Sequence, residues 1–263
     1  MAFRYGPGPI LDSFPGATAA YGLRRLNSAY TGACITVRRS SDNTTANIGF
    51  YRYTLDTDAV LNFVGNGTGF VTNWYDQSGN GVNLYQSNTG LQFSICNSGS
   101  LFYEGSDVVM NAATAKGFLR NTNTTVLSNW TVYVKSRMTN ASQPYGTYVG
   151  HPGSINGLIQ HSSAGGLVYY NGAYIEIGGG VSSYSNAYRK IQAKRNGTTT
   201  NVRGYQNGVN LGNNNVSVDL NISTNAKIFN DFAGGGYTGT VRELIIYPVE
   251  HSDFTIRQIN NTM

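Results

Sequence analysis

The chain has 263 residues, a length that one large β domain can fill. Charged residues make up only 12%, about half the usual share of a soluble protein, so solubility must come from amides and hydroxyls. The net charge of +5 is spread over scattered pairs of basic residues, which argues against nucleic-acid binding and favours a mildly cationic face toward an anionic glycan or a neighbouring protein. No run of 18 apolar residues occurs, so no membrane insertion is expected.

Residues 1–16 hold three of the six prolines and several glycines, which predicts an extended N-terminal arm without a core of its own. We expect this arm to be held by a neighbouring subunit, and residues 17–263 to form a single domain. The first residues contain no apolar stretch typical of a secretion signal, so no signal peptide is expected.

Helical signals are few and short. Residues 17–28 (ATAAYGLRRLNS) predict a short helix that a glycine weakens. A second helix is predicted to begin after Asp56 as N-cap and to end at Gly65, and a third to begin after Ser252. The apolar positions expected to face the core are Val60, Phe63, Val64, Ile256 and Ile259.

The pattern of the remaining residues predicts short strands and turns. In WTVYVKS, residues 130–136, apolar side chains alternate with polar ones. Two Asn-Gly pairs, Asn196–Gly197 and Asn207–Gly208, predict hairpins, and a strand from Thr240 to Tyr247 ends at Pro248. Many short strands with little helix predict an all-β jelly-roll sandwich of two antiparallel sheets with a few short helices.

The two cysteines, Cys34 and Cys96, match no disulfide framework and no metal-binding spacing. They are interpreted as two buried small apolar residues, with a single bridge between them as the alternative. The three histidines form no zinc spacing either, so no metal or other cofactor is expected from the residues themselves.

The C-terminal region, YTGTVRELIIYPVEHSDFTIRQIN, resembles the end of the concanavalin A-like, laminin-G-like jelly roll. That family ends with a strand of glycine, apolar residues, one glutamate and a tyrosine, followed by a short crossing and a helix. The matching residues are Gly239, Val241, Glu243, Leu244, Ile245, Ile246 and Tyr247. By analogy with this fold alone, a calcium ion is an additional candidate ligand.

The N-terminal region is more specific. AAYGLRRLNSAYTGACITVRRSSDNTTANIGF, followed by LDTDAVLNFVGNGTGFVTNWYDQSGNGVNL, resembles the catalytic domain of family 54 α-L-arabinofuranosidases and a group of bacteriophage virion surface proteins. The second resemblance implies a virion structural protein, either a tail-fibre or spike adsorption module or a capsid or tail decoration protein, assembled in the host cytoplasm. Its implied partners are other virion proteins through the arm, host-surface glycan and further copies of the chain.

The segment NWYDQSGNG is interpreted as a structural turn shared by both groups. Asp76 and Ser78 can bond main-chain groups within the turn, and Gly79 and Gly81 can take positive φ. One of the aromatics Trp74 and Tyr75 is expected in the core and the other at the surface, because they point to opposite faces.

A retaining glycosidase needs two carboxyl groups, one as nucleophile and one as acid/base. Asp231, in NDFAGGGYTG, matches the place where the arabinofuranosidase family has its acid/base, which makes it a weak catalytic candidate. No glutamate occurs between residues 108 and 175, and Glu176 is the nearest alternative nucleophile. The sequence therefore favours a non-enzymatic protein, with a glycoside hydrolase of the α-L-arabinofuranosidase type as the alternative.

Tyrosines are concentrated in a glycine-rich stretch that neither resemblance covers well. Tyr169, Tyr170, Tyr174 and Tyr184 are the candidate ligand-binding residues, because aromatic rings stack on sugars in lectin-like surfaces. The alternative is that they cover sheet faces or subunit contacts, where tyrosine is also enriched.

Overall fold

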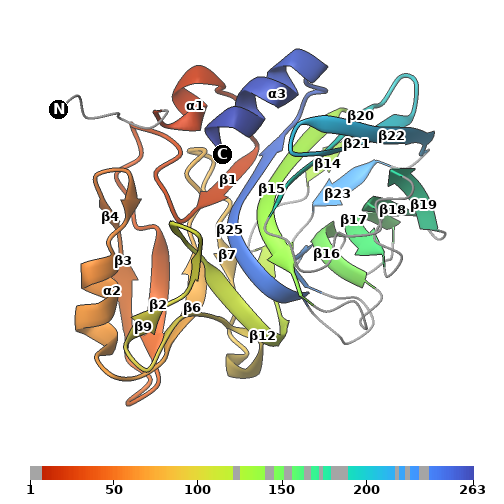
Figure 1. The fold of residues 1–263 in the computed structure, drawn as a ribbon. Helices are drawn as coiled ribbons and strands as arrows, with labels where there is room; N and C mark the ends of the chain where they lie inside the picture. Colours follow the sequence, from red (N-terminus) through yellow and green to blue (C-terminus); the bar gives the residue numbers. More distant parts are fainter. Residues whose placement is uncertain are drawn as a thin grey trace.

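The computed structural model describes residues 8–120, 125–139, 145–150, 156–162, 167–171, 174–178, 189–216, 219–222, 226–230 and 237–263. Between residues 145 and 191 much of the description covers the backbone alone. Antiparallel strands dominate these ranges and the helices are short, so the predicted all-β sandwich of two antiparallel sheets is confirmed (Figure 1).

The first sheet is built around one long C-terminal strand. Its strands are β1 (Ala19–Gly22), β12 (Met110–Lys116), β15 (Trp130–Met138), β20 (Arg189–Asn196), β21 (Asn201–Gln206), β22 (Val209–Asn215) and β25 (Tyr237–Tyr247). They pair antiparallel in the order β22–β21–β20–β15–β25, and the other edge of β25 is shared by β1 and β12. The C-terminal strand is therefore paired on both edges, as a central strand should be.

The second sheet joins the N-terminal half to the middle of the chain. Its strands are β2 (Ile35–Arg39), β3 (Thr45–Ile48), β6 (Gly69–Trp74), β7 (Leu84–Tyr85), β13 (Phe118–Arg120), β16 (Tyr145–Gly150), β17 (Asn156–Ser162), β18 (Leu167–Asn171), β19 (Tyr174–Gly178) and β24 (Lys227–Ile228). They follow the order β3–β2–β6–β7–β13–β24–β16–β17–β18–β19. Strand β8 (Phe93–Asn97) also pairs with β6 and touches β12, which links the two sheets.

The remaining elements are short pairs and helices at the edges. They are β4 (Phe50–Tyr51) with β5 (Thr54–Leu55), β9 (Ser100–Leu101), β10 (Tyr103–Glu104) with β11 (Asp107–Val108), β14 (Thr125–Leu127) with β23 (Leu220–Ile222), the 3₁₀ turn η1 (Thr89–Leu91), α1 (Ile10–Ser13), α2 (Thr57–Val64) and α3 (Asp253–Thr262). None of the described helices is both long and apolar enough to cross a bilayer.

Two of the predicted helices are confirmed with their caps. The Asp56 side chain accepts a hydrogen bond from the main-chain N–H of Ala59 (3.0 Å), and α2 ends at Gly65. The Ser252 hydroxyl accepts from the N–H of Thr255 (3.1 Å) at the start of α3. A side-chain acceptor at the N-cap satisfies a donor that the helix leaves unpaired, so both helix starts were readable from sequence.

The helix predicted over residues 17–28 is wrong. Residues Ala19–Gly22 form β1 instead and pair with β25, Ala19 opposite Ile246 and Gly22 opposite Glu243. Long-range pairing with a central strand outweighs a weak local helix preference.

The described part of the predicted N-terminal arm folds onto its own domain. Ile10–Ser13 is helical, and Ile10 and Leu11 are buried in a cluster with the α3 residues Ile256 and Ile259. The N–H of Leu11 donates to the carbonyl of Leu26 (2.8 Å). Two large apolar side chains give this segment its own anchor, so over residues 8–16 the extended conformation expected from the prolines is wrong. Subunit contact through residues 1–7 and homo-oligomerisation stay predictions.

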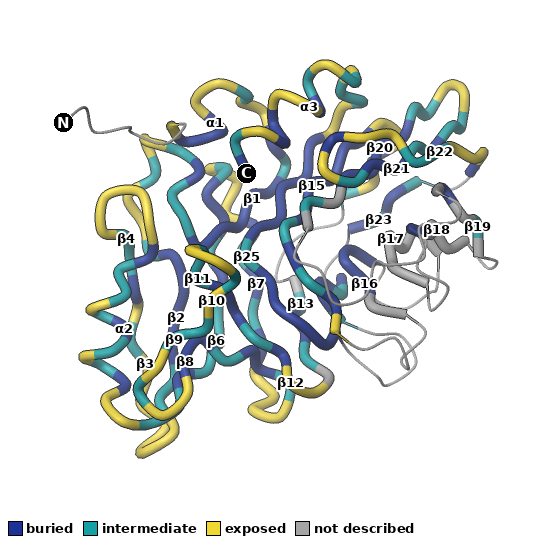
Figure 2. The backbone as a smooth tube through the Cα atoms, in the orientation of Figure 1, coloured by how far each residue is buried: buried dark blue, intermediate teal, exposed yellow. Residues whose placement is uncertain are grey.

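The core has two parts on either side of the first sheet. A large cluster between the sheets contains Trp74, Trp130 and Val132, and a smaller one under α1 and α3 contains Tyr133 and Ile245. The alternation predicted for residues 130–136 is present, but both faces of β15 are covered, and Figure 2 shows it buried along much of its length. A strand between two clusters has no solvent face.

Of the two predicted Asn-Gly hairpin turns, one is confirmed and the other is confirmed in part. Asn207 and Gly208, with φ of 50° and 78°, form the two-residue turn between β21 and β22. The Asn196–Gly197 signal instead opens a four-residue turn, in which the Asn196 side chain accepts from the N–H of Thr198 (2.9 Å). Cys34 and Cys96 are both free and buried, as interpreted from the sequence.

Candidate functional site

Asp76 lies at the start of the loop between β6 and β7, and donors saturate its carboxylate. Oδ1 accepts from the main-chain N–H of Ala20 (2.8 Å) and of Ser78 (2.9 Å). Oδ2 accepts from the N–H of Val82 (3.0 Å) and from the Ser78 hydroxyl (2.7 Å). A carboxylate has about four lone-pair positions, so these donors leave none for a substrate. Asp76 ties the loop to β1.

The next residue, Gln77, makes a second tie that sequence reasoning missed. Its side chain has no exposed surface. Its Oε1 accepts from the N–H of Leu26 (2.7 Å), and its Nε2 donates to the carbonyls of Gly22 (2.9 Å) and Arg24 (3.1 Å). One amide side chain therefore satisfies one N–H and two carbonyls at the end of β1 and in the segment that follows it. A glutamine between an aspartate and a serine carried no local signal for this contact.

The rest of the loop is a tight polar turn. Gly79 and Gly81 have φ of 94° and 69°, the left-handed region that glycine tolerates. The Ser78 hydroxyl accepts from the N–H of Asn80 (3.2 Å), whose side chain in turn donates to the carbonyl of Ala17 (3.0 Å). Every polar group named here serves the loop or its contact with the chain before β1.

The two aromatics that begin the loop lie on opposite faces. Trp74 is fully buried among Tyr21, Phe118 and Phe229. The Tyr75 hydroxyl is hydrogen-bonded to that of Thr36 (2.9 Å) at the partly exposed face. Neither presents a free ring face toward a described cavity, so this segment belongs to the scaffold.

The carboxylates of the described residues are almost all engaged in structural contacts. Those that accept hydrogen bonds or form ion pairs are Asp12, Asp42, Asp56, Asp76, Glu104, Asp107, Asp219, Glu243, Glu250 and Asp253. Asp58 is exposed in the first turn of α2. Within this part of the chain no three His, Cys, Asp or Glu side chains gather as a metal site.

The remaining two acids are the ones that the sequence singled out for catalysis. Asp231 lies outside the described residues. Glu176 is described by its backbone alone, in β19, where it stands opposite Val168 of β18. Among the candidate ligand-binding tyrosines, Tyr184 lies outside the described residues, and for Tyr169, Tyr170 and Tyr174 the description covers only the backbone, in β18 and β19. The lectin-like surface assigned to these tyrosines stays a prediction.

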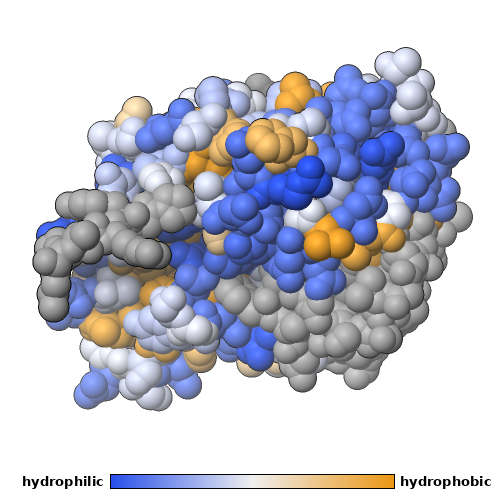
Figure 3. Space-filling view, turned by 45° about the horizontal axis from the view of Figure 1, so that its top comes forward, coloured by the Kyte–Doolittle hydropathy of each residue, from blue (hydrophilic) through white to orange (hydrophobic). Residues whose placement is uncertain are grey.

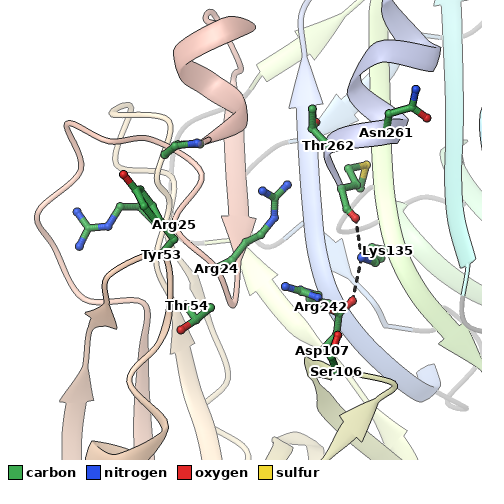
Figure 4. A pocket seen from close by; sticks show the side chains of 12 residues that line it. Arg24, Arg25, Tyr53, Thr54, Ser106, Asp107, Lys135, Arg242, Asn261 and Thr262 are labelled. Carbon is green, nitrogen blue, oxygen red and sulfur yellow. Dashed lines mark hydrogen bonds and ion pairs between the residues drawn. The ribbon is translucent and has the colours of Figure 1, made fainter. Parts of the chain in front are cut away.

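A cavity of about 530 Å³ lies on the side of the first sheet that carries α1 and α3. Figure 4 shows its two walls: Arg24, Arg25 and Tyr53 on one side, and Lys135 and Arg242 on the other. The face drawn in Figure 3 is largely hydrophilic, with hydrophobic residues in small separate patches. The cavity therefore combines several cations with an exposed aromatic ring.

Ion pairs hold most of these cations in place. Arg24 forms a two-point pair with Glu243, with Nε–Oε2 at 2.8 Å and Nη2–Oε1 at 3.0 Å. Lys135 Nζ lies 2.8 Å from Asp107 Oδ2 and donates to the main-chain oxygen of Met263 (2.6 Å). Arg242 also pairs with Asp107. The walls are thus fixed by contacts between the segment after β1 and the strands β11, β15 and β25.

The family model described as "Alpha-L-arabinofuranosidase B, catalytic" matches residues 12–155, more than half of the chain. The chain belongs to this family. The match includes the Asp76 loop and β15, and it places the chain among glycoside hydrolases by family and fold.

This membership corrects the main functional expectation from the sequence. The interpretation as a bacteriophage virion structural protein was wrong, and so were its virion localisation and its tail-fibre, decoration and non-enzymatic roles, because family and fold both match arabinofuranosidases. The physical reason is visible in the Asp76 loop. Its residues encode a turn, and a turn cannot distinguish a hydrolase from a structural protein that shares the scaffold.

Solved arabinofuranosidases have a similar fold across nearly the whole chain. A GH54 α-L-arabinofuranosidase soaked with a cyclic sulfate inhibitor has a TM-score of 0.72 at 19% identity, and an arabinofuranosidase complexed with arabinofuranosyl-α-1,2-xylobiose has 0.69 at 18%. Both matches cover 98% of this chain and 64% of the other. At this identity the likeness shows the fold alone.

The fold is more distantly similar to that of a single domain of a larger enzyme. Domain 4 of a GH43 extracellular arabinanase from Geobacillus stearothermophilus, in complex with arabinotriose, has a TM-score of 0.53 at 11% identity over 73% of this chain and 98% of that one. No curated protein matches the chain.

Proposed function

We propose that this chain is a glycoside hydrolase that cleaves α-L-arabinofuranosides. The observation that carries the proposal is the family match over residues 12–155, supported by the fold shared with arabinofuranosidases over 98% of the chain. One of those relatives was solved after soaking with 4-nitrophenyl α-L-arabinofuranoside, which names a convenient probe.

The distribution of carboxylates supports a specific catalytic pair. Hydrolysis at a glycosidic carbon needs one carboxyl group as nucleophile or base and one as acid. The described carboxylates are held in structural contacts or exposed on α2, and a carboxylate whose lone pairs are filled is a poor catalyst. We assign the acid/base to Asp231, whose place in the sequence matches that of the family's acid/base, and the nucleophile to Glu176, the nearest alternative glutamate in the sequence.

Turnover of 4-nitrophenyl α-L-arabinofuranoside tests the proposal. We expect Glu176→Gln to lower kcat/KM by at least a thousandfold, because it removes the nucleophile. Asp231→Asn should lower kcat by about a hundredfold or more and kcat/KM much less, because 4-nitrophenolate leaves without a proton whereas hydrolysis of the glycosyl-enzyme still needs the base. Asp58→Asn is the matched control, since it removes an exposed carboxylate of α2 and should leave turnover unchanged.

Chemical rescue separates the two roles. Azide should rescue Glu176→Ala with formation of a β-configured glycosyl azide, because azide displaces the leaving group directly. It should rescue Asp231→Ala with formation of an α-configured glycosyl azide, because azide attacks the glycosyl-enzyme. No turnover by the unaltered chain would refute the function. Full turnover by both carboxylate variants would refute the assigned pair and leave the function standing.

A further inference from the structure

We propose that the cavity between Arg24, Arg25 and Tyr53 on one wall and Lys135 and Arg242 on the other binds a carboxylated sugar, a uronate residue. The cavity lies on the side of the first sheet that carries α1 and α3. The strands β16–β19, which include Glu176, lie on the other side of β15 and β25 (Figure 1). It would therefore hold a part of a glycan other than the bond assigned to cleavage. The claim that the ligand is a sugar rests on the proposed function, whereas the claim that it carries a negative charge rests on the cavity itself.

Charge is the first argument. Four cations line the cavity, against the Asp107 carboxylate, the buried Glu243 behind Arg24 and the main-chain carboxylate of the last residue, Met263, which accepts from Lys135. Arg25 donates only to main-chain oxygens, those of Arg52 (3.2 Å) and Tyr30 (2.7 Å), and no described carboxylate lies within ion-pair distance of it. Positive charge is thus in excess inside a concave surface, where the field is strongest.

The second argument is an unsatisfied donor. Arg242 Nε is buried and has no hydrogen-bond acceptor among the described residues. Burial lowers the pKa of Arg242 to about 10 and also lowers the pKa of Lys135, because both cations have lost water that the nearby carboxylates only partly replace. A buried donor without a partner is costly. A ligand carboxylate toward which the guanidinium turns would supply the missing acceptor, since its two oxygens match the planar guanidinium fork.

The third argument concerns the sugar ring. Tyr53 lines the cavity and is 52% exposed, so it can offer a ring face to a pyranose. Thr54, Ser106 and Asn261 line the same cavity and can bond sugar hydroxyls. An aromatic platform, neutral hydrogen-bonding groups and a cluster of cations together fit an acidic sugar better than either a neutral sugar or a bare inorganic anion.

Calorimetric binding of monosaccharides tests the proposal directly. D-Galacturonate and D-glucuronate are titrated into the full chain alongside their neutral counterparts, D-galactose and D-glucose, and inorganic phosphate. We expect a uronate to bind at least tenfold more tightly than its neutral counterpart and more tightly than phosphate. Binding should weaken with added salt, because the contact is an ionic one.

Substitutions locate the site. Arg242→Gln, Arg25→Gln and Tyr53→Ala should each weaken uronate binding at least fivefold. The matched controls are Arg257→Gln, which removes an exposed cation of α3, and Tyr51→Ala, which removes a 64%-exposed ring outside the cavity lining. Both controls should bind as the unaltered chain does. Arg25→Gln keeps the test valid if Arg242→Gln fails to fold, because no carboxylate of the described residues is left unpaired by it.

Three results would overturn the proposal: no uronate binding, equal binding of neutral sugars, or tighter binding of phosphate, which would make the cavity a phosphate site. Binding that none of the three cavity substitutions changes would place the uronate elsewhere and overturn it too. The arabinofuranoside assay reports separately on the proposed function. A chain that binds uronate without turnover refutes only the function, and one that turns over substrate without binding uronate refutes only the cavity site.

Discussion

Arg24 and Glu243 are 219 residues apart in the sequence and form a two-point ion pair, in which the Glu243 side chain has no exposed surface and that of Arg24 is 12% exposed. The pair joins the segment after β1 to the middle of β25. It therefore holds the N-terminal part of the chain against the central strand of the first sheet.

We expect Arg24→Met to lower the free energy of unfolding by about 3 kcal/mol, because it leaves a buried carboxylate without its main partner. The double variant Arg24→Met with Glu243→Met should be more stable than the single one, since no unpaired charge remains. Urea unfolding followed by tryptophan fluorescence measures both. A loss of under 1 kcal/mol in the single variant would mean that water or Lys135 replaces the guanidinium.

Substitution of Asp76 tests whether its carboxylate in the segment NWYDQSGNG is structural or catalytic. Asp76→Asn turns one acceptor oxygen into a donor that faces main-chain N–H groups, so we expect a loss of about 2–3 kcal/mol. At temperatures where the variant is folded, turnover of the arabinofuranoside should be unchanged. A stable variant without turnover would show that the carboxylate touches substrate after all.

Local signals decided which parts of the fold were predictable. Capping side chains such as Asp56 and Ser252 and the Asn207–Gly208 turn act over a few residues, so they could be read correctly from one sequence. The segment 17–28 could not, because β1 exists through its pairing with β25, which is more than 200 residues away. The same limit hid the helix at Ile10–Ser13, whose two apolar residues matter only once α3 is beside them.

The candidate sites show the same division. The turn residues around Asp76 were identified because its bonds to Ser78 and Val82 are local. Its bond to Ala20 and the contacts of Gln77 with residues 22–26 were overlooked, because those partners are more than 50 residues away. The cavity could not be predicted at all. Arg24, Lys135 and Arg242 come from three distant segments, and in the sequence they are unremarkable scattered cations.

His251 should make stability depend on pH. Its pKa is lowered to about 4 from 6.5, chiefly by burial and then by the nearby Lys194 ammonium. Its ring nitrogen Nδ1 is hydrogen-bonded to the Tyr133 hydroxyl (2.7 Å), and the Tyr247 ring lies 4.4 Å away, centroid to centroid. Between pH 6.5 and 4 the unfolded chain binds a proton that the folded chain does not, so stability falls as pH falls through this range.

Urea unfolding at pH 7.5, 6, 5 and 4.5 measures this slope, and His251→Gln should flatten it. The Asp253 carboxylate also contributes, because Lys194 and Tyr205 lower its pKa below 3.8. The contribution of Asp253 to stability is lost only as pH falls below 3.8, whereas that of His251 is lost between pH 6.5 and about 4. The two effects therefore occur in different pH ranges. An unchanged slope in His251→Gln would assign the pH dependence to other groups.

The two cysteines should be inert in the folded chain. Both are free and buried, and burial raises the pKa of each thiol, so the reactive thiolate is scarce. We expect a thiol reagent to label neither cysteine in buffer and both in concentrated urea. Reducing agent should leave the melting temperature unchanged. Fast labelling of one cysteine in buffer would indicate local opening around that residue.

Gly239 is the position in β25 where the backbone allows no side chain. Its φ is +134°, and a Cβ added there would collide with the carbonyl oxygen of Arg137 in β15, next to its pairing partner Met138. We expect Gly239→Ala to cost about 3 kcal/mol or more, because strain in β25 and displacement of β15 add together. Gly49→Ala is the matched control, with no atom within 4 Å of the added Cβ and no positive φ. Thermal and urea unfolding of the two variants should therefore differ widely, and equal stability would mean that β15 and β25 can shift apart at little cost.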